Sequence, residues 1–179
     1  EHCCITAGKV FGNTHVLMEG GYVVRNVYGG GSLSSIGGPK IPPIDYDPYR
    51  KGDTADGHGV GKQSLNEVII SGSTATIGDE TSYDANDNHV YGGLVFGASR
   101  GDETLSNPTS FASSVWTDVK VQGGTIYGDV YGGGEVGTVR QGAEVQLTGG
   151  TVKHDAYGGG KGTATVAANV GGDVLLELI

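Results

Sequence analysis

Short runs in which apolar and polar residues alternate recur along the chain. In Val119-Lys-Val-Gln122 the period is two, which places the valines on one face of a β-strand. The same alternation occurs at Val16/Met18, Val68/Ile70 and Val145/Leu147. No segment shows the 3.6-residue period of an amphipathic helix. The pattern therefore predicts an all-β protein with many short strands.

Each alternating run belongs to a longer unit that is repeated. Residues 119–134 and 145–160 align without a gap at an offset of 145 − 119 = 26 residues, and residues 16–31 align with both. In all three copies an apolar run is followed by Gly-Gly, a polar turn, a small apolar residue, a tyrosine and three glycines. Residues 68–74 and 89–93 supply the two halves of an interrupted copy, and residues 171–176 resemble the start of another.

Repetition of the same residue types at the same positions favours stacking of one copy on the next. Stacked strands lie about 4.8 Å apart, so that equal positions become ladders of equal side chains. We therefore expect one domain, residues 1–179, that forms a right-handed parallel β-helix (β-solenoid) with coils of 26 residues. One tyrosine of each coil would then belong to a structural ladder formed by Tyr28, Tyr91, Tyr131 and Tyr157.

Composition narrows the classes of function. The 179 residues include 35 glycines but only 5 prolines and no Gly-X-Y period, which excludes collagen. A formal net charge of −9 without a basic stripe argues against nucleic acid as a partner. No apolar run reaches the roughly 18 residues of a membrane span. The adjacent Cys3 and Cys4 have neither CxxC nor metal-type spacing.

The segment from Gly123 to Val139, GGTIYGDVYGGGEVGTV, resembles the glycine-rich repeats of large surface proteins of Bacteroidetes-type bacteria. Such proteins are similar to adhesins and to autotransporter stalks. The resemblance implies an extracellular location at the bacterial cell surface, a structural or adhesive role, and glycans or other surface proteins as partners. It also leads us to expect that this chain is part of a longer protein.

Three insertions interrupt the repeat, at about residues 38–61, 78–88 and 100–114. Loops on a rigid scaffold are where binding residues usually lie, so these insertions are the candidate binding regions. The candidates for stacking on a sugar or on a partner are Tyr46, Tyr49, Arg50 and Tyr83. The alternative is that these side chains pack on the scaffold or that the insertions are tolerated decorations.

Acidic residues in the insertions suggest Ca²⁺, which prefers oxygen ligands. The best candidates lie in the second insertion and are Asp79, Glu80, Asp84 and Asp87, with Asn88 beside them. A second acidic group in the first insertion comprises Asp45, Asp47, Asp53 and Asp56. A solvated acidic loop is the alternative, because the glycine and closing glutamate of an EF-hand are missing. No other cofactor is predicted.

Two further functions stay open. A carbohydrate-active β-helix enzyme, of the polysaccharide lyase or hydrolase type, would need paired carboxylates in a groove. Asp129 and Asp155 are one repeat apart, but both occupy a turn position where aspartate is favoured for backbone reasons, so we predict no catalytic residue and no enzyme. The second alternative is a self-assembling filament, formed through strand edges exposed at the coil ends.

Overall fold

Parallel β-strands form all the regular structure that can be described. The computed structural model describes residues 9–10, 12–37, 64–105 and 111–179. Their strands are β1 (Thr14–Met18), β2 (Tyr22–Val23), β3 (Val27–Tyr28), β4 (Leu65–Ile70), β5 (Thr76–Ile77), β6 (Val95–Phe96), β7 (Ser113–Ser114), β8 (Trp116–Ile126), β9 (Val130–Tyr131), β10 (Thr138–Val139), β11 (Ala143–Val152), β12 (Ala156–Tyr157) and β13 (Val174–Leu178). Every pairing between two of these strands is parallel. The prediction of an all-β protein is confirmed for this part, in which no helix is long and apolar enough to cross a membrane.

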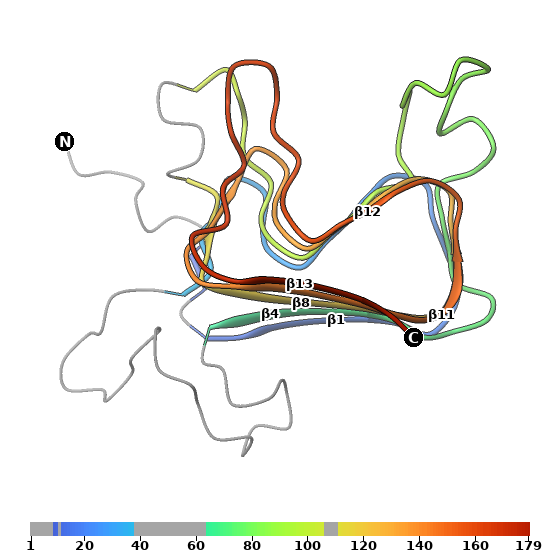
Figure 1. Cartoon of the computed structure of the whole chain (residues 1–179), viewed down its shortest axis with the longest axis horizontal. Helices are drawn as coiled ribbons and strands as arrows, with labels where there is room; N and C mark the ends of the chain where they lie inside the picture. Colours follow the sequence, from blue (N-terminus) through green and yellow to red (C-terminus); the bar gives the residue numbers. More distant parts are fainter. Residues whose placement is uncertain (1–8, 11, 38–63, 106–110) are drawn as a thin grey trace, which may run out of the picture.

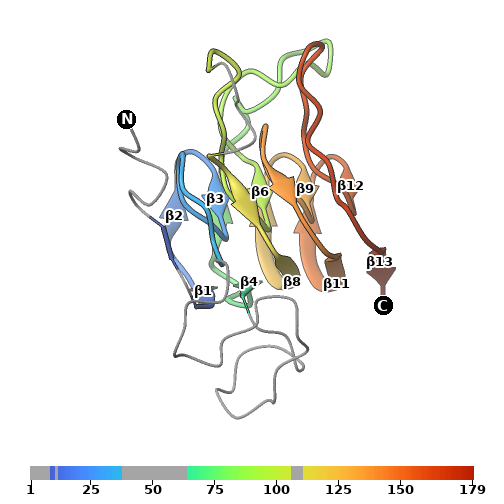
Figure 2. The same ribbon diagram turned by 90° about the vertical axis from the view of Figure 1, so that its left-hand side faces the viewer.

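The strands form three sheets. The largest has the order β1-β4-β8-β11-β13, with β2 and β5 beside β8; the second is β3-β6-β9-β12, and the third pairs β7 with β10. The chain therefore visits the first two sheets in turn and then returns next to its earlier strands. We call the successive passes level 1 (β1 to β3), level 2 (β4 to β6), level 3 (β8, β9), level 4 (β11, β12) and level 5 (β13). The levels overlie one another in Figure 1 and lie side by side in chain order in Figure 2.

The register of the largest sheet matches the alignment of the repeats. Val16 pairs with Val68, Val68 with Val119, Val119 with Val145 and Val145 with Leu176. The offsets are 68 − 16 = 52, 119 − 68 = 51, 145 − 119 = 26 and 176 − 145 = 31 residues. Only levels 3 and 4 are thus separated by the bare repeat, and the longer offsets contain the insertions.

Inward side chains of successive levels form one apolar core. Val68, Val119 and Val145 have no exposed surface, and neither have Ile70 and Val121. Each fully buried valine or isoleucine stabilises the fold by about 1.5–3 kcal/mol relative to its exposed state. The period-two pattern therefore places the apolar columns where the sequence predicts them.

Geometry requires glycine at two positions of the repeat. The second glycine of each Gly-Gly pair has a positive φ, 87° at Gly21, 78° at Gly124 and 76° at Gly150. The glycine after the aromatic residue lies against the next level instead. A Cβ there would approach the carbonyl oxygen above it to 2.2 Å at Gly29 and to 2.3 Å at Gly97 and Gly132.

The insertions differ from their predicted bounds. The first lies outside the described residues. The second leaves at Gly78, whose N–H bonds to the Val23 carbonyl, and returns at Gly93, whose N–H bonds to the Arg25 carbonyl, both at 2.9 Å. Residues 78–88 are therefore too short a range, and the excursion is Asp79–Gly92.

The third insertion is shorter than predicted. Arg100 forms parallel bridges with Ser32 and Glu135, and Ser113–Ser114 form β7. Both ends of the range 100–114 therefore belong to the stacked structure and not to a loop.

Candidate functional site

A continuous stack of four aromatic rings crosses the sheet β3-β6-β9-β12. Ring centroids are 5.0 Å apart for Tyr28 and Phe96, 5.0 Å for Phe96 and Tyr131, and 4.9 Å for Tyr131 and Tyr157. The planes deviate from parallel by only 5°, 9° and 13°. Aromatic pairs at such separations contribute about 0.5–1.5 kcal/mol beyond their buried area. We call this stack the aromatic column.

The predicted tyrosine ladder was wrong at one position. Phe96, and not Tyr91, pairs with Tyr28 and Tyr131. Phe96 is fully buried, as are its neighbours Leu94 and Val95, whereas Tyr91 is 46% exposed. The segment Leu94–Phe96 buries more apolar surface than Val90-Tyr91 would, so the chain enters the sheet four residues later. This choice could have been found by allowing phenylalanine at the tyrosine position.

Hydrogen bonds link each tyrosine of levels 3 and 4 to the aspartate two residues before it. The hydroxyl of Tyr131 donates to Asp129 and that of Tyr157 donates to Asp155, both at 2.8 Å. Asp129 also accepts the backbone N–H of Asp155 at 3.1 Å. Burial, followed by this bond to Asp129, raises the pKa of Tyr131. The two aspartates thus serve the turn and the aromatic column.

The excursion Asp79–Gly92 is fixed to level 4 by Tyr83. Its ring stacks on His154 at a centroid distance of 3.5 Å and meets His89 edge-on at 5.3 Å. Burial, followed by a hydrogen bond to Asp129, raises the pKa of Tyr83. One face of this predicted ligand-binding ring is therefore covered by the protein itself.

The predicted calcium ligands of this excursion take part in local contacts. Asp79 accepts hydrogen bonds from the N–H and hydroxyl of Thr81, and Asp84 accepts the N–H groups of Asn86 and Asn88. These bonds hold the pKa of both carboxyl groups below its usual value.

The other two predicted ligands are also placed. Glu80 is exposed, and Asp87 lies 3.1 Å from Nδ1 of His154. Among the described residues, no three His, Cys, Asp or Glu side chains converge as a metal site. Calcium binding therefore stays a prediction. The remaining candidates lie outside the described residues: Tyr46, Tyr49, Arg50, Asp45, Asp47, Asp53, Asp56, Cys3 and Cys4.

A pocket of about 310 Å³ lies between the returning end of the excursion and the edge of levels 1 to 3. We call it the arginine pocket. Its lining residues are Arg25, Asn26, Tyr28, His89, Val90, Tyr91, Gly92, Arg100 and Glu135. They come from three different levels and from the excursion, so the sequence gave no local signal for them.

Polar contacts order the walls of the arginine pocket. The Arg25 guanidinium lies over the Tyr91 ring, 5.1 Å from its centroid, and its Nε donates to the Tyr91 hydroxyl. Nε of Arg100 lies 3.2 Å from Glu135, which also accepts the hydroxyl of Tyr28. Burial first, and then Glu135, raises the pKa of Tyr28.

A charged cluster lies on the outward side of β4 and β8. Lys120 Nζ is 2.8 Å from Glu67 and 2.9 Å from Asp118, and Nδ1 of His15 is 2.8 Å from Glu67. Glu67 and Asp118 are only 4% and 5% exposed. Burial raises the pKa of Asp118 against the effect of Lys120. For Glu67, burial acts in the same direction, but hydrogen bonds from Lys120 and His15 outweigh it and lower the pKa.

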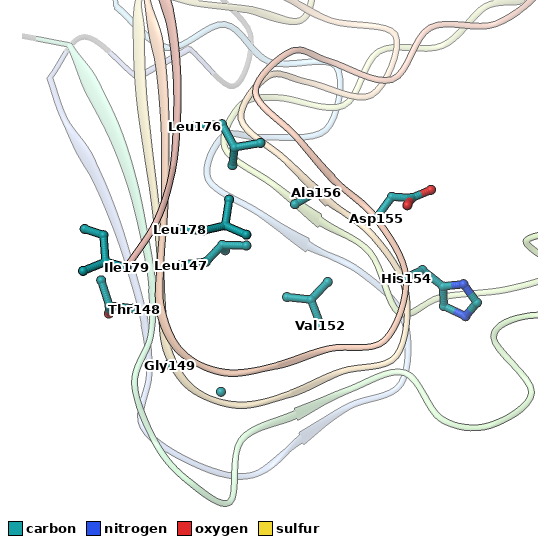
Figure 3. A pocket seen from close by; sticks show the side chains of 11 residues that line it. Leu147, Thr148, Gly149, Val152, His154, Asp155, Ala156, Leu176, Leu178 and Ile179 are labelled. Carbon is teal, nitrogen blue, oxygen red and sulfur yellow. The ribbon is translucent and has the colours of Figure 1, made fainter.

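An apolar hollow of about 680 Å³ lies where levels 4 and 5 end the stack. Figure 3 shows Leu147, Val152 and Leu178 directed into it, whereas His154 and Asp155 point away. In β13, Val174 is 49% and Leu178 is 74% exposed.

Comparisons with protein families, with curated proteins and with solved structures found no match.

Proposed function

We propose that the chain is a module of a right-handed parallel β-solenoid that acts as a rigid, adhesive element of an extracellular bacterial surface protein. The observation that carries this proposal is the aromatic column, with rings 4.9–5.0 Å apart through four levels. Such a column requires the same position of every level to lie above its predecessor. The five-strand parallel sheet with matched apolar positions supports the same winding.

Stacking of this kind gives the module its mechanical role. Every level is hydrogen-bonded to its neighbours along whole strands, so bending the stack would break a ladder of backbone bonds and not a single contact. The repeated glycines let carbonyl groups approach within the distance that the ladders need. The stack is therefore suited to hold a loop at a fixed position.

The excursion Asp79–Gly92 is the loop that we propose to present a ligand-binding surface. It is anchored at its base by Gly78 and Gly93 and on its side by Tyr83 against His154. It also forms one wall of the arginine pocket.

Deletion of residues 79–92 tests this proposal. The register pairs Ile77 with Ile126 and places Leu94 opposite Asp129, so joining Gly78 to Gly93 restores the two-residue spacing of Tyr127-Gly128. We expect the deletion variant to keep a cooperative thermal transition, and to lose the binding that the unaltered protein shows on an array of host and bacterial glycans.

Two outcomes would contradict the proposal. Absence of glycan or surface-protein binding by the unaltered protein would remove the adhesive role. Release of unsaturated or hydrolysed products from acidic polysaccharides would favour an enzyme instead.

A filament subunit is the second candidate, and the exposed edge of β13 favours it. Among the described strands, β13 pairs only with β11 and β1 pairs only with β4. The register that joins β11 to β13 would equally join β13 of one copy to β1 of a second, and Leu176 would then continue the column that begins at Val16.

A further inference from the structure

We propose that the arginine pocket binds a carboxylate-bearing sugar, a single uronic-acid-type residue of an acidic glycan. This inference rests on the adhesive role proposed above and names the ligand class of its binding surface. Its basis is the convergence of two guanidinium groups, an aromatic ring and a carboxylate in one pocket.

The two guanidinium groups are held in place and can still donate. Arg25 uses Nε toward the Tyr91 hydroxyl, and Arg100 uses Nε toward Glu135. The described residues offer the terminal nitrogens of both groups no hydrogen-bond partner. Terminal nitrogens of a fixed guanidinium match the two oxygens of a carboxylate, which is the geometry that makes bidentate pairs specific.

The remaining lining residues match the rest of a sugar ring. Glu135 and Asn26 can accept and donate hydrogen bonds to ring hydroxyl groups, and Tyr91 with Val90 supplies an apolar surface for the C–H face. Tyr91 is 46% exposed, so its surface is available, in contrast to the covered face of Tyr83.

Charge and size favour a small acid. Arg25, Arg100 and Glu135 give the pocket a local charge of 2 − 1 = +1 in a chain whose formal net charge is −9. A volume of about 310 Å³ is near the lower end of the range for small-molecule sites, which suits one sugar residue and not a longer segment. A macromolecular acidic glycan would thus place a single carboxylated unit here.

Isothermal titration calorimetry of the whole chain with D-glucuronate tests the inference. D-glucose carries the ring without the carboxylate, acetate carries the carboxylate without the ring, and inorganic phosphate is a general anion. We expect D-glucuronate to bind at least about tenfold more tightly than each of the three. We expect Arg25→Gln and Arg100→Gln each to weaken glucuronate binding about tenfold or more.

Lys153→Gln is the matched control, because Lys153 lies over the Tyr127 ring at 5.5 Å, outside the arginine pocket. It removes one positive charge from a cation–ring pair and should leave glucuronate binding unchanged. Thermal melts of all three variants identify any loss of folding.

Separate outcomes distinguish the two proposals. Equal binding of glucuronate and glucose, equal binding of phosphate, or unaltered affinity in both arginine variants overturns the inference. If the protein then still binds other glycans through the excursion Asp79–Gly92, the adhesive proposal stands. If neither glucuronate nor any arrayed glycan or surface protein binds, both proposals fail.

Discussion

At the scale of single residues, the closest constraint is the glycine that follows the aromatic column. A Cβ at Gly132 would lie 2.3 Å from the Gly158 carbonyl oxygen, whereas a Cβ at Gly159 meets nothing within 4 Å. We expect Gly132→Ala to lower the free energy of unfolding by about 1–3 kcal/mol because two levels must separate locally. Gly159→Ala should change it by less than about 0.5 kcal/mol. Chemical denaturation measures both, and equal effects would contradict the close stacking.

The buried pair Glu67 and Asp118 should respond oppositely to neutralisation. Glu67 has a lowered pKa, so its charge stabilises the fold above the unfolded value of 4.5 and that contribution is lost as the pH falls through the folded pKa. We therefore expect Glu67→Gln to destabilise the protein at pH 7 by about 1.5–3 kcal/mol, the usual range for hydrogen bonds to a charged group.

Asp118→Asn is the contrasting variant. The pKa of Asp118 is raised above 3.8, so folding disfavours its charge and the wild type gains stability relative to Asp118→Asn as the pH falls through that pKa. At pH 7 the variant should therefore cost less than Glu67→Gln, since one buried carboxylate oxygen of Asp118 has no partner in the described structure. Thermal melts between pH 3 and 7 measure both slopes, and parallel slopes would count against this assignment.

At the scale of elements, level 2 departs from its neighbours in a correlated way. Levels 3 and 4 pair an aspartate with a tyrosine, and level 2 has Leu94 and Phe96 at the same positions. We expect Phe96→Tyr alone to leave a buried hydroxyl without its acceptor and to cost about 1–3 kcal/mol. Leu94→Asp alone should also destabilise, because it buries a carboxylate. The double variant should be more stable than the sum of the two predicts, by about 0.5–3 kcal/mol in a double-mutant cycle.

The sequence specified the elements better than it specified the site. Period-two alternation was sufficient to identify Val68, Val119 and Val145 as one column, because burial acts on every second residue of a strand. The aromatic column was misassigned at level 2, since a second Tyr-Gly-Gly at Tyr91 imitates the repeat outside it. The arginine pocket could not be predicted, because the lengths of the insertions decide which residues of different levels meet.

At the scale of the whole molecule, the stack has two strand edges that fit one another. The inward positions of β13 are Val174, Leu176 and Leu178, and those of β1 are Val16 and Met18, so that stacking a second copy would cover the hollow of Figure 3 with apolar side chains. A head-to-tail contact of this kind does not close on itself and therefore produces open chains of molecules.

Sedimentation velocity over a range of protein concentrations tests the filament candidate through this contact. We expect the average mass to rise with concentration, and the double substitution Leu176→Lys/Leu178→Lys to keep the protein monomeric, because two ammonium groups would have to enter the apolar hollow. Ala85→Lys/Asn86→Lys adds the same charge at exposed positions of the excursion and should associate like the unaltered protein. A constant monomer mass at every concentration would exclude the filament, and association that survives the β13 substitutions would place the contact elsewhere.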